Sequence, residues 1–235
     1  MPHDDLARGL DLIGRADSRA AELLSPASDR IARLLDRYVR EIQAGNPALS
    51  LVGTDDRQEI IQRHILDSLS PLGIIAEKLA SAPAGADGRK SIADIGSGAG
   101  LPGIPLALAM PEVPFTLIEN KGRRAGFLRD MASLLALKNV TVEEQEMEKT
   151  RLGPFSLLVF RAFRPLTPEI YRKLARLCRK GGTLAAYKGR REKAEAEIAA
   201  LQAAIPALEG RWQLLPCPVP DLEEERHLLL IDCPS

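Results

Sequence analysis

The stretch Ser91-Ile92-Ala93-Asp94-Ile95-Gly96-Ser97-Gly98-Ala99-Gly100-Leu101-Pro102-Gly103 decides the fold of this chain, because a short apolar run stops at four closely spaced glycines. Repeated glycine at a strand end indicates backbone with positive φ, or backbone that another group must approach closely. Leu101 to Met110 then reads as a helix opening, with Pro102 and Pro105 in the first turn, where a missing N–H costs little. A strand, a glycine turn and a helix N-terminus together predict a nucleotide-type site.

The glycine pattern fits two cofactor motifs. Gly98, Gly100 and Gly103 match the G-x-G-x-x-G of dinucleotide enzymes, whereas Gly96, Gly98 and Gly100 match the G-x-G-x-G of S-adenosylmethionine enzymes. The first glycine should follow the strand directly, which favours Gly96 as the leader and a methyl donor as the ligand. Asp94 at the strand end could face the amino group of a methionine moiety, but beside a pyrophosphate it would be repulsive. A purely structural turn is the third interpretation.

An acidic residue ends the next apolar run. Pro114 to Ile118 is followed by Glu119, roughly twenty residues beyond the glycine turn. A carboxylate at that spacing can accept both ribose hydroxyls of an adenosine. The alternative is a solvated carboxylate after a strand, and the pairing with the glycine turn favours the ribose interpretation.

The composition predicts an ordinary soluble protein with a sizeable hydrophobic core. The 235 residues are 45% hydrophobic and formally neutral, enough for one α/β domain with an appendage. We expect a cytoplasmic protein that does not enter a membrane, because the start lacks a signal-peptide pattern and no apolar run reaches about 18 residues. The three cysteines form no C-x-x-C and the three histidines are scattered, so we expect neither a disulfide framework nor a metal site.

The neutral total hides a basic half. Between Glu119 and Lys193 there are eighteen Lys and Arg residues against eight Asp and Glu. Because this surplus follows directly on the cofactor segments, it indicates a polyanionic substrate, with RNA the leading candidate. The competing interpretation is a solvated helix face, as on the helix that carries Arg172 to Lys180.

The pattern of apolar residues divides the chain in two. Residues 1–88 are predicted to form a helical subdomain, in which Gly45-Asn46-Pro47 ends one long helix, and residues 89–235 a doubly wound seven-stranded α/β domain. One helix of the second domain is predicted to have Thr167 as N-cap, Pro168 at its first position and Gly181-Gly182 as terminator. The expected strands are Ser91–Ile95, Phe115–Ile118, Val140–Glu143, Leu157–Phe160, Thr183–Tyr187, Trp212–Leu215 and His227–Asp232.

Several segments together resemble the RsmG (GidB) family, methyltransferases that modify N7 of one guanosine in bacterial small-subunit (16S) ribosomal RNA. Besides the glycine turn and Thr116-Leu117-Ile118-Glu119, the resemblance rests on these segments: Arg63-His64-Ile65-Leu66-Asp67-Ser68-Leu69, Lys121 to Leu128, Arg161-Ala162-Phe163, Tyr187-Lys188-Gly189 and Glu225-Arg226-His227-Leu228. The resemblance implies a Rossmann-like class I methyltransferase that uses S-adenosylmethionine, with 16S ribosomal RNA or the small ribosomal subunit as partner. We also expect the protein to act as a monomer.

The resemblance also implies roles for single residues. It places Gly96 and Leu101 around the donor, together with Gly98 of the turn, and Glu119 on the ribose. The remaining donor-site residues are Met147 and Glu148 beside the adenine, and Arg161 near the site. The chain departs from the family pattern where members often carry Arg (here Glu146), an aromatic residue (here Gly45) and Asn-Leu-Thr (here Ser50-Leu51-Val52).

Methylation at guanine N7 needs little acid–base machinery. N7 carries a lone pair and no proton, so in-line positioning in a partly desolvated pocket can supply most of the acceleration. We therefore expect Arg161 and Lys188, both at strand ends on the cofactor side, to orient donor or RNA.

Four further side chains are candidates near the site. His64 and Asp67, one helical turn apart, could form a hydrogen-bonded pair that joins the two domains, or could contact RNA or donor. Phe163 and Tyr187 could stack on the guanine, although core packing fits each as well.

Two other functions remain open from the residues. One is an RNA-binding or assembly module that keeps the fold without turnover. The other is a nicotinamide-dependent oxidoreductase that uses the literal G-x-G-x-x-G, for which the sequence offers no evident hydride-transfer acid.

Overall fold

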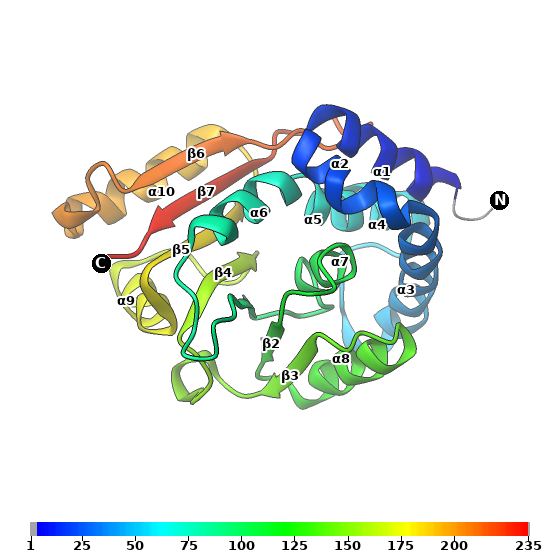
Figure 1. Cartoon of the computed structure of the whole chain (residues 1–235), viewed down its shortest axis with the longest axis horizontal. Helices are drawn as coiled ribbons and strands as arrows, with labels where there is room; N and C mark the ends of the chain where they lie inside the picture. The colour runs from blue at the N-terminus through cyan, green and yellow to red at the C-terminus, as the bar shows by residue number, and fades with distance from the viewer. Residues whose placement is uncertain (1–3, 235) are drawn as a thin grey trace.

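A computed structural model describes residues 4–234, and its centre is a seven-stranded mixed sheet in the order β3-β2-β1-β4-β5-β7-β6 (Figure 1). The strands are β1 (Ile92–Ile95), β2 (Phe115–Glu119), β3 (Val140–Glu144), β4 (Phe155–Arg161), β5 (Cys178–Lys188), β6 (Trp212–Pro216) and β7 (His227–Asp232). β1 to β5 are parallel, and β7 runs antiparallel between β5 and β6. The order reverses between β1 and β4, where open α/β sheets bind ligands at the carboxyl ends of their strands. All seven predicted strands are confirmed.

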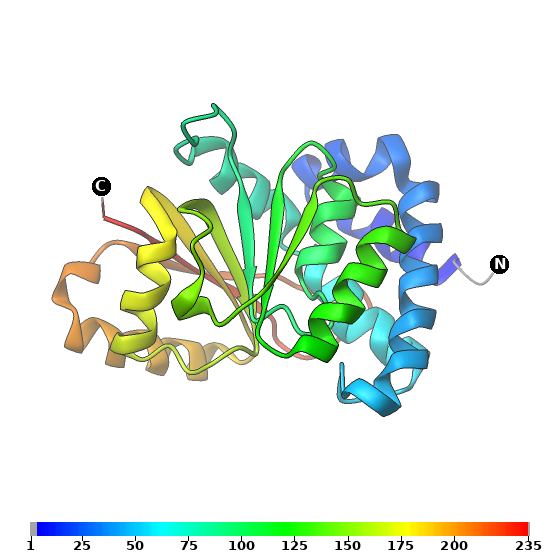
Figure 2. The same ribbon diagram turned by 90° about the horizontal axis from the view of Figure 1, so that it is seen from below.

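Side-chain alternation along the strands sends neighbouring residues to opposite faces. Ile92 and Leu117 lie on the face of the sheet that is covered by the N-terminal helices together with α7 (Gly103–Ala109) and α8 (Gly122–Leu134). Ala93 and Ile95 belong to a second apolar cluster beneath the helices of the other face. Those helices are α9 (Pro168–Leu177) and α10 (Arg191–Ala204), with the short η3 (Met147–Lys149) and η4 (Pro206–Leu208). Figure 2 shows the two helical layers on either side of the sheet.

The N-terminal third is helical, as predicted. Its elements are α1 (Asp4–Ala16), α2 (Ser18–Leu24), η1 (Ser25–Ala27), α3 (Ser28–Leu49), α4 (Arg57–Ile60), η2 (Ile61–Leu66), α5 (Asp67–Leu69) and α6 (Leu72–Ser81). These helices share one apolar cluster with the sheet, and the buried Tyr38 hydroxyl donates to the Ala99 carbonyl oxygen at 2.5 Å. The helical layer is therefore packed directly onto the glycine turn. The division into residues 1–88 and 89–235 stays a prediction.

The predicted end of α3 at Gly45-Asn46-Pro47 is wrong, because the helix continues through Pro47 to Leu49. The buried Asn46 side chain holds the following loop: its Nδ2 donates to Asp55 Oδ1 at 2.6 Å, and its Oδ1 accepts from Val52 N–H at 2.9 Å. These tertiary bonds outweigh the backbone N–H that proline lacks.

The predicted terminator Gly181-Gly182 is also wrong. The Thr167 cap and the Pro168 start are confirmed, but α9 ends at Leu177 and β5 begins at Cys178. The glycines lie in an irregular part of β5, between the pairs Phe155–Cys178 and Leu157–Thr183. A Cβ on Gly182 would lie 2.6 Å from the Ser156 carbonyl oxygen, so glycine permits close strand contact there.

Among the helices between residues 4 and 234, none combines the length and apolar character needed to cross a membrane.

Candidate active site

A cavity of about 780 Å³ opens at the carboxyl ends of the central strands, beside the glycine turn. Its walls come from the turn after β1, the end of β4, the end of β5, the segment before β7 and the N-terminal helix η2. A second cavity of about 220 Å³ lies toward the end of β2. Gly96, Arg124 and Ala162 to Arg164 line both cavities, so one ligand can extend from one into the other. The large cavity has the volume of a typical small-molecule site.

The glycine turn requires its glycines. Gly96, Gly98 and Gly100 have φ angles of 68°, 60° and 94°, which L side chains rarely adopt. A Cβ on Gly96 would lie 2.3 Å from Phe163 Cδ2. A Cβ on Gly98 would meet no atom closer than the Gly96 carbonyl oxygen at 3.8 Å, so positive φ is the reason for glycine there. The turn thus exposes bare backbone to both cavities, as a close-fitting ligand requires. Leu101 lines the large cavity, as its predicted role requires.

Asp94 lies beneath the turn and not at the cavity wall, so the predicted contact with a methionine amino group is wrong. The side chain is completely buried, and its Oδ2 accepts from Ser97 Oγ at 2.6 Å and from Gly103 N–H at 3.0 Å. Burial raises the pKa of this carboxyl to about 6, although both hydrogen bonds oppose the shift. Asp94 therefore shapes the turn and anchors the start of α7.

Glu119 ends β2 with a buried carboxylate that faces the small cavity. Its Oε2 accepts from Gly98 N–H and its Oε1 from Lys121 N–H, both at 2.9 Å. Each carboxylate oxygen has a second lone pair, so two hydroxyl groups of a ligand can still be bound. The structure thereby joins the two sequence signals, the glycine turn and the acid, in one rigid unit.

Met147 and Glu148 lie at η3, and they differ in position. Met147 is buried and lines the small cavity. Glu148 lines neither cavity, because its Oε1 accepts from Arg164 Nη1 at 2.8 Å and from Lys173 Nζ at 3.4 Å. Glu148 therefore acts on the cavities through Arg164, which lines both.

The two aromatic candidates also differ. Phe163 covers Gly96, lines both cavities and carries the Arg164 guanidinium 4.9 Å above its ring centre. Tyr187 is buried, and its hydroxyl donates to the Ser68 carbonyl oxygen at 2.8 Å. Both rings line the large cavity, but Phe163 also lines the small one, whereas the Tyr187 hydroxyl joins β5 to the N-terminal helices.

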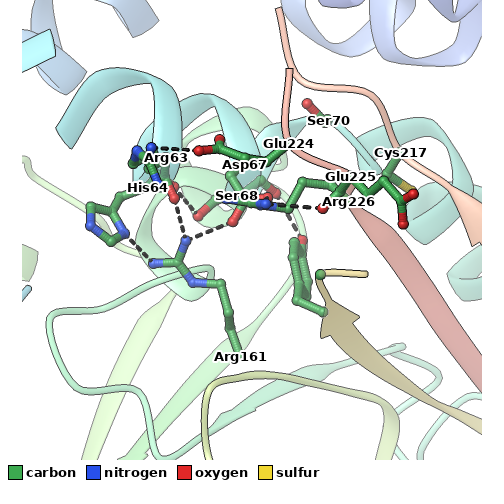
Figure 3. A network of polar contacts seen from close by, with 12 residues as sticks. Arg63, His64, Asp67, Ser68, Ser70, Arg161, Cys217, Glu224, Glu225 and Arg226 are labelled. Carbon is green, nitrogen blue, oxygen red and sulfur yellow. Dashed lines mark hydrogen bonds and ion pairs between the residues drawn. The ribbon is translucent and has the colours of Figure 1, made fainter. Parts of the chain in front are cut away.

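Arg161 is the centre of a polar network between β4 and the N-terminal helices (Figure 3). Its Nη1 donates to Asp67 Oδ2 at 2.8 Å and to the Arg63 carbonyl oxygen at 3.0 Å. Its Nη2 lies 3.1 Å from His64 Nδ1. The buried Asp67 also binds Arg226 Nε through Oδ1 at 3.2 Å. Each of the predicted partners, His64 and Asp67, thus binds Arg161, and the connection between helices and sheet runs through that arginine.

The helix that carries this network is π-helical in its middle. In η2 the turns are wider than in an α-helix, and Asp67 N–H donates to the Gln62 carbonyl oxygen five residues earlier. This geometry brings the Arg63 carbonyl, the His64 ring and the Asp67 carboxylate to a single arginine. Sequence periodicity predicts a regular helix here and does not reveal the wider turn.

Lys188 lies at the cavity wall but on the opposite face of β5 from Tyr187. Its Nζ lies 2.5 Å from Glu197 Oε2 of α10, and Glu197 Oε1 also accepts from Leu166 N–H at 2.6 Å. Arg161 and Lys188 therefore line one cavity while they belong to separate networks on the two faces of the sheet.

Cations outnumber carboxylates among the side chains that line the large cavity. Its charged side chains are six cations and two carboxylates: Arg63, Arg124, Arg161, Arg164, Lys188 and Arg226 against Asp67 and Glu197. Sequence reasoning did not assign roles to Arg63, Arg124, Arg164 and Arg226. Three of these four lie within segments that carried the family resemblance, and Arg164 follows such a segment directly.

The departures from the family pattern have local explanations. At Gly45 a Cβ would lie 3.3 Å from Leu51 Cδ1 and 3.5 Å from Phe127 Cε2, so the space next to it is already filled. Glu146 lines the small cavity and pairs with Lys149 at 3.0 Å. Ser50 ends α3 in the left-handed conformation, and Val52 lines the large cavity.

Known proteins match this chain over most of its length. The family model GidB, described as rRNA small subunit methyltransferase G, matches residues 31–228. A ribosomal RNA small subunit methyltransferase G of Alkalilimnicola ehrlichii is 38% identical over 87% of this chain and 84% of its own length. The enzyme of that name from Treponema pallidum subsp. pallidum is 36% identical over 87% of this chain and 86% of its own length.

A solved structure agrees with the fold. A putative O-methyltransferase from Klebsiella pneumoniae aligns with a TM-score of 0.55 at 18% identity, covering 86% of this chain and 90% of that one.

Proposed function

The chain belongs to the GidB family of rRNA small subunit methyltransferase G, and from this premise we propose that it methylates N7 of a guanosine in 16S ribosomal RNA. It is an S-adenosylmethionine-dependent methyltransferase of Rossmann-like class I fold. The observation that carries the proposal is the union of the glycine turn with Glu119 at the edge of a cavity lined by six cations.

The donor site is proposed from the two connected cavities. Glu119 would bind the ribose hydroxyls, with Met147 beside the adenine in the small cavity. The methionine part of the donor would then lie in the large cavity against Gly96, Gly98 and Leu101. When bound, S-adenosylmethionine supplies an electrophilic methyl group on its sulfonium. Glu148 would support the adenine side by holding Arg164.

In the proposed reaction the main task of the protein is to orient the methyl donor and the guanine base. N7 attacks with its lone pair and releases no proton, so the site needs no general base. Arg161 is held by Asp67, His64 and a backbone carbonyl, and is therefore a rigid wall of the cavity. Lys188 is held by Glu197. We propose both as groups that position donor or RNA, because free positive charge beside a purine that becomes cationic would oppose the reaction.

The charge and shape of the large cavity support an RNA substrate. Six cations favour phosphate, and Arg is suited to bind it bidentately. Side chains cannot readily reach N7 in the deep major groove of A-form RNA, so the target base should lie in a loop or be splayed out. Phe163 between the two cavities is the candidate platform for that base. We place the enzyme in the cytoplasm with ribosomal RNA and propose that it acts as a monomer.

Mass spectrometry of ribosomal RNA tests this function. Small-subunit RNA from cells with and without the gene is digested to oligonucleotides, and the 7-methylguanosine content of each fragment is compared. We expect one site to lose its methyl group without the gene and to regain it when purified protein and S-adenosylmethionine are added. An unchanged methylation map, with donor binding intact, would contradict the assigned acceptor and favour an RNA-binding role or another substrate.

A further inference from the structure

His64 is held in one protonation and tautomeric form by Arg161. A guanidinium has only N–H donors, so the 3.1 Å contact from Arg161 Nη2 requires His64 Nδ1 to be an acceptor. An imidazole with an unprotonated Nδ1 carries its hydrogen on Nε2. The structure therefore defines His64 as a neutral ring with an N–H at Nε2.

The charges around His64 keep the ring neutral. Burial is the largest cause, followed by Arg161, Arg226 and Arg63, and together they lower the pKa of His64 to about 4. At neutral pH the ring is thus a fixed hydrogen-bond donor that brings no charge of its own.

The Nε2 side of the ring faces ligand space. His64 is half-buried and lines the large cavity, and Figure 3 shows its second nitrogen on the side of the ring away from Arg161. Between residues 4 and 234, no side chain or carbonyl accepts a hydrogen bond from this nitrogen. A group bound in the cavity can accept it.

This end of the cavity suits a single negative charge. Arg63 pairs with Glu224 at 2.5 Å, and Asp67 binds both Arg161 and Arg226. Arg63 also lies 3.9 Å from Glu59, so carboxylates balance its charge, whereas Arg161 and Arg226 share the single carboxylate of Asp67. That shared pairing leaves one positive charge in excess beside the neutral His64 donor.

The donor's own geometry directs a negative group to this place. With ribose at Glu119 and adenine at Met147, the rest of the donor would pass Gly96 into the large cavity, which Arg63 and His64 of η2 also line. The one anionic group of S-adenosylmethionine is its methionine carboxylate. We propose that His64 donates its Nε2–H to this carboxylate and, with Arg161, forms the carboxylate subsite of the donor. The inference rests on the proposed function, because it requires that S-adenosylmethionine is bound here.

Isothermal titration calorimetry with two ligands tests the subsite without measuring turnover. The ligands are S-adenosylmethionine and decarboxylated S-adenosylmethionine, which differ only in the carboxylate. We expect the wild-type protein to bind S-adenosylmethionine at least about 10-fold more tightly, the effect typical of a charge-assisted hydrogen bond.

Two substitutions of His64 isolate the Nε2 donor. His64→Asn keeps an acceptor for Arg161 near the Nδ1 position and removes the Nε2–H. It should lower the preference for the carboxylate about 10-fold while affinity for the decarboxylated ligand is unchanged. His64→Gln places an amide N–H near the Nε2 position and should restore part of the preference. Gln62→Ala, on the same helix but outside the cavity lining, is the matched control and should retain it.

The outcomes separate the subsite from the function. A wild-type protein that binds both ligands equally overturns the carboxylate subsite alone. A His64→Asn variant with normal preference but weakened binding of ribosomal RNA also overturns it, and assigns His64 to a phosphate. A wild-type protein that binds neither ligand overturns the proposed function itself. Circular dichroism of each variant verifies that it is folded.

Discussion

The two halves of the active site are built in different ways. The donor half, from Gly96 to Glu119, is held by backbone hydrogen bonds between two adjacent strands and by backbone N–H groups that donate to the Glu119 carboxylate. The opposite half, around Arg161, is held by side-chain ion pairs among segments from three distant parts of the chain. Backbone geometry tolerates few residue types, whereas an ionic network depends on every partner being present. Substitutions in the donor half should therefore mainly weaken ligand binding, and substitutions in the ionic network should mainly lower the free energy of unfolding.

The largest effect is expected for Asp67→Ala. This buried carboxylate lies between Arg161 and Arg226, and its loss leaves two poorly solvated guanidinium groups without their common partner. We expect the free energy of unfolding to fall by about 3 kcal/mol, measured by urea denaturation. Asp11→Ala removes an exposed pair with Arg15 and should cost less than about 1 kcal/mol. Equal losses in the two variants would show that the network is not a stabilising centre.

Glu119→Ala tests the donor half. It removes the acceptor of Gly98 N–H and of Lys121 N–H together with the proposed ribose ligand. Affinity for S-adenosylmethionine should fall by about 100-fold, with a loss of stability near 2 kcal/mol. Calorimetry measures the first effect and denaturation the second, and the exposed Glu209→Ala is the control for both. If binding persists while stability falls, Glu119 has only a structural role.

The pH dependence of stability tests the charge environment of His64. Its folded pKa of about 4 lies below the unfolded value near 6.5, so the unfolded chain binds more protons between these pH values. Stability should therefore rise as pH increases from about 4 to 6.5, by on the order of 2 kcal/mol for this partly exposed group.

The His64→Asn variant should lack this rise, so the difference between the two denaturation profiles isolates His64. Arg63, Arg161, Arg226 and Asp67 surround the ring in both proteins and cancel in the difference. The contribution of Asp94 also cancels in the difference. Because its pKa is raised, it makes stability fall as pH increases between about 3.8 and 6 in both proteins. Parallel profiles would contradict the neutral, proton-resisting ring.

The smallest effect is expected for Lys188→Met. The ion pair with Glu197 is partly exposed, and Glu197 keeps its hydrogen bond from Leu166 N–H. Stability should fall by about 1 kcal/mol or less, and KM for RNA should rise a few-fold while affinity for the donor is unchanged. Lys193→Met on the exposed face of α10 is the control. A large loss of kcat at saturating RNA would instead assign Lys188 to the reacting groups.

The local parts of the fold could be predicted because each has a local cause. The seven strands follow from short apolar runs, and the meeting of the glycine turn with Glu119 follows from spacing along two neighbouring strands. The errors arise where a distant contact overrules local preference. Pro47 stays within α3 because the buried Asn46 holds the next loop, and Gly182 lies in β5 because of a contact with Ser156.

The chain order of residues was enough to identify the glycine turn and its acidic partner, since strand, turn and acid lie within about thirty residues. It was also enough to identify the family, from segments spread between Arg63 and Leu228. It could not show that Asp94 is buried under the turn, that Glu148 points to Arg164, or that His64 and Asp67 meet through Arg161. Those arrangements depend on strand alternation, on the wider turn of η2 and on the packing of helices from one end of the chain against strands from the other. Side-chain direction and partner are properties of the packed structure, because they arise from contacts between residues far apart in sequence.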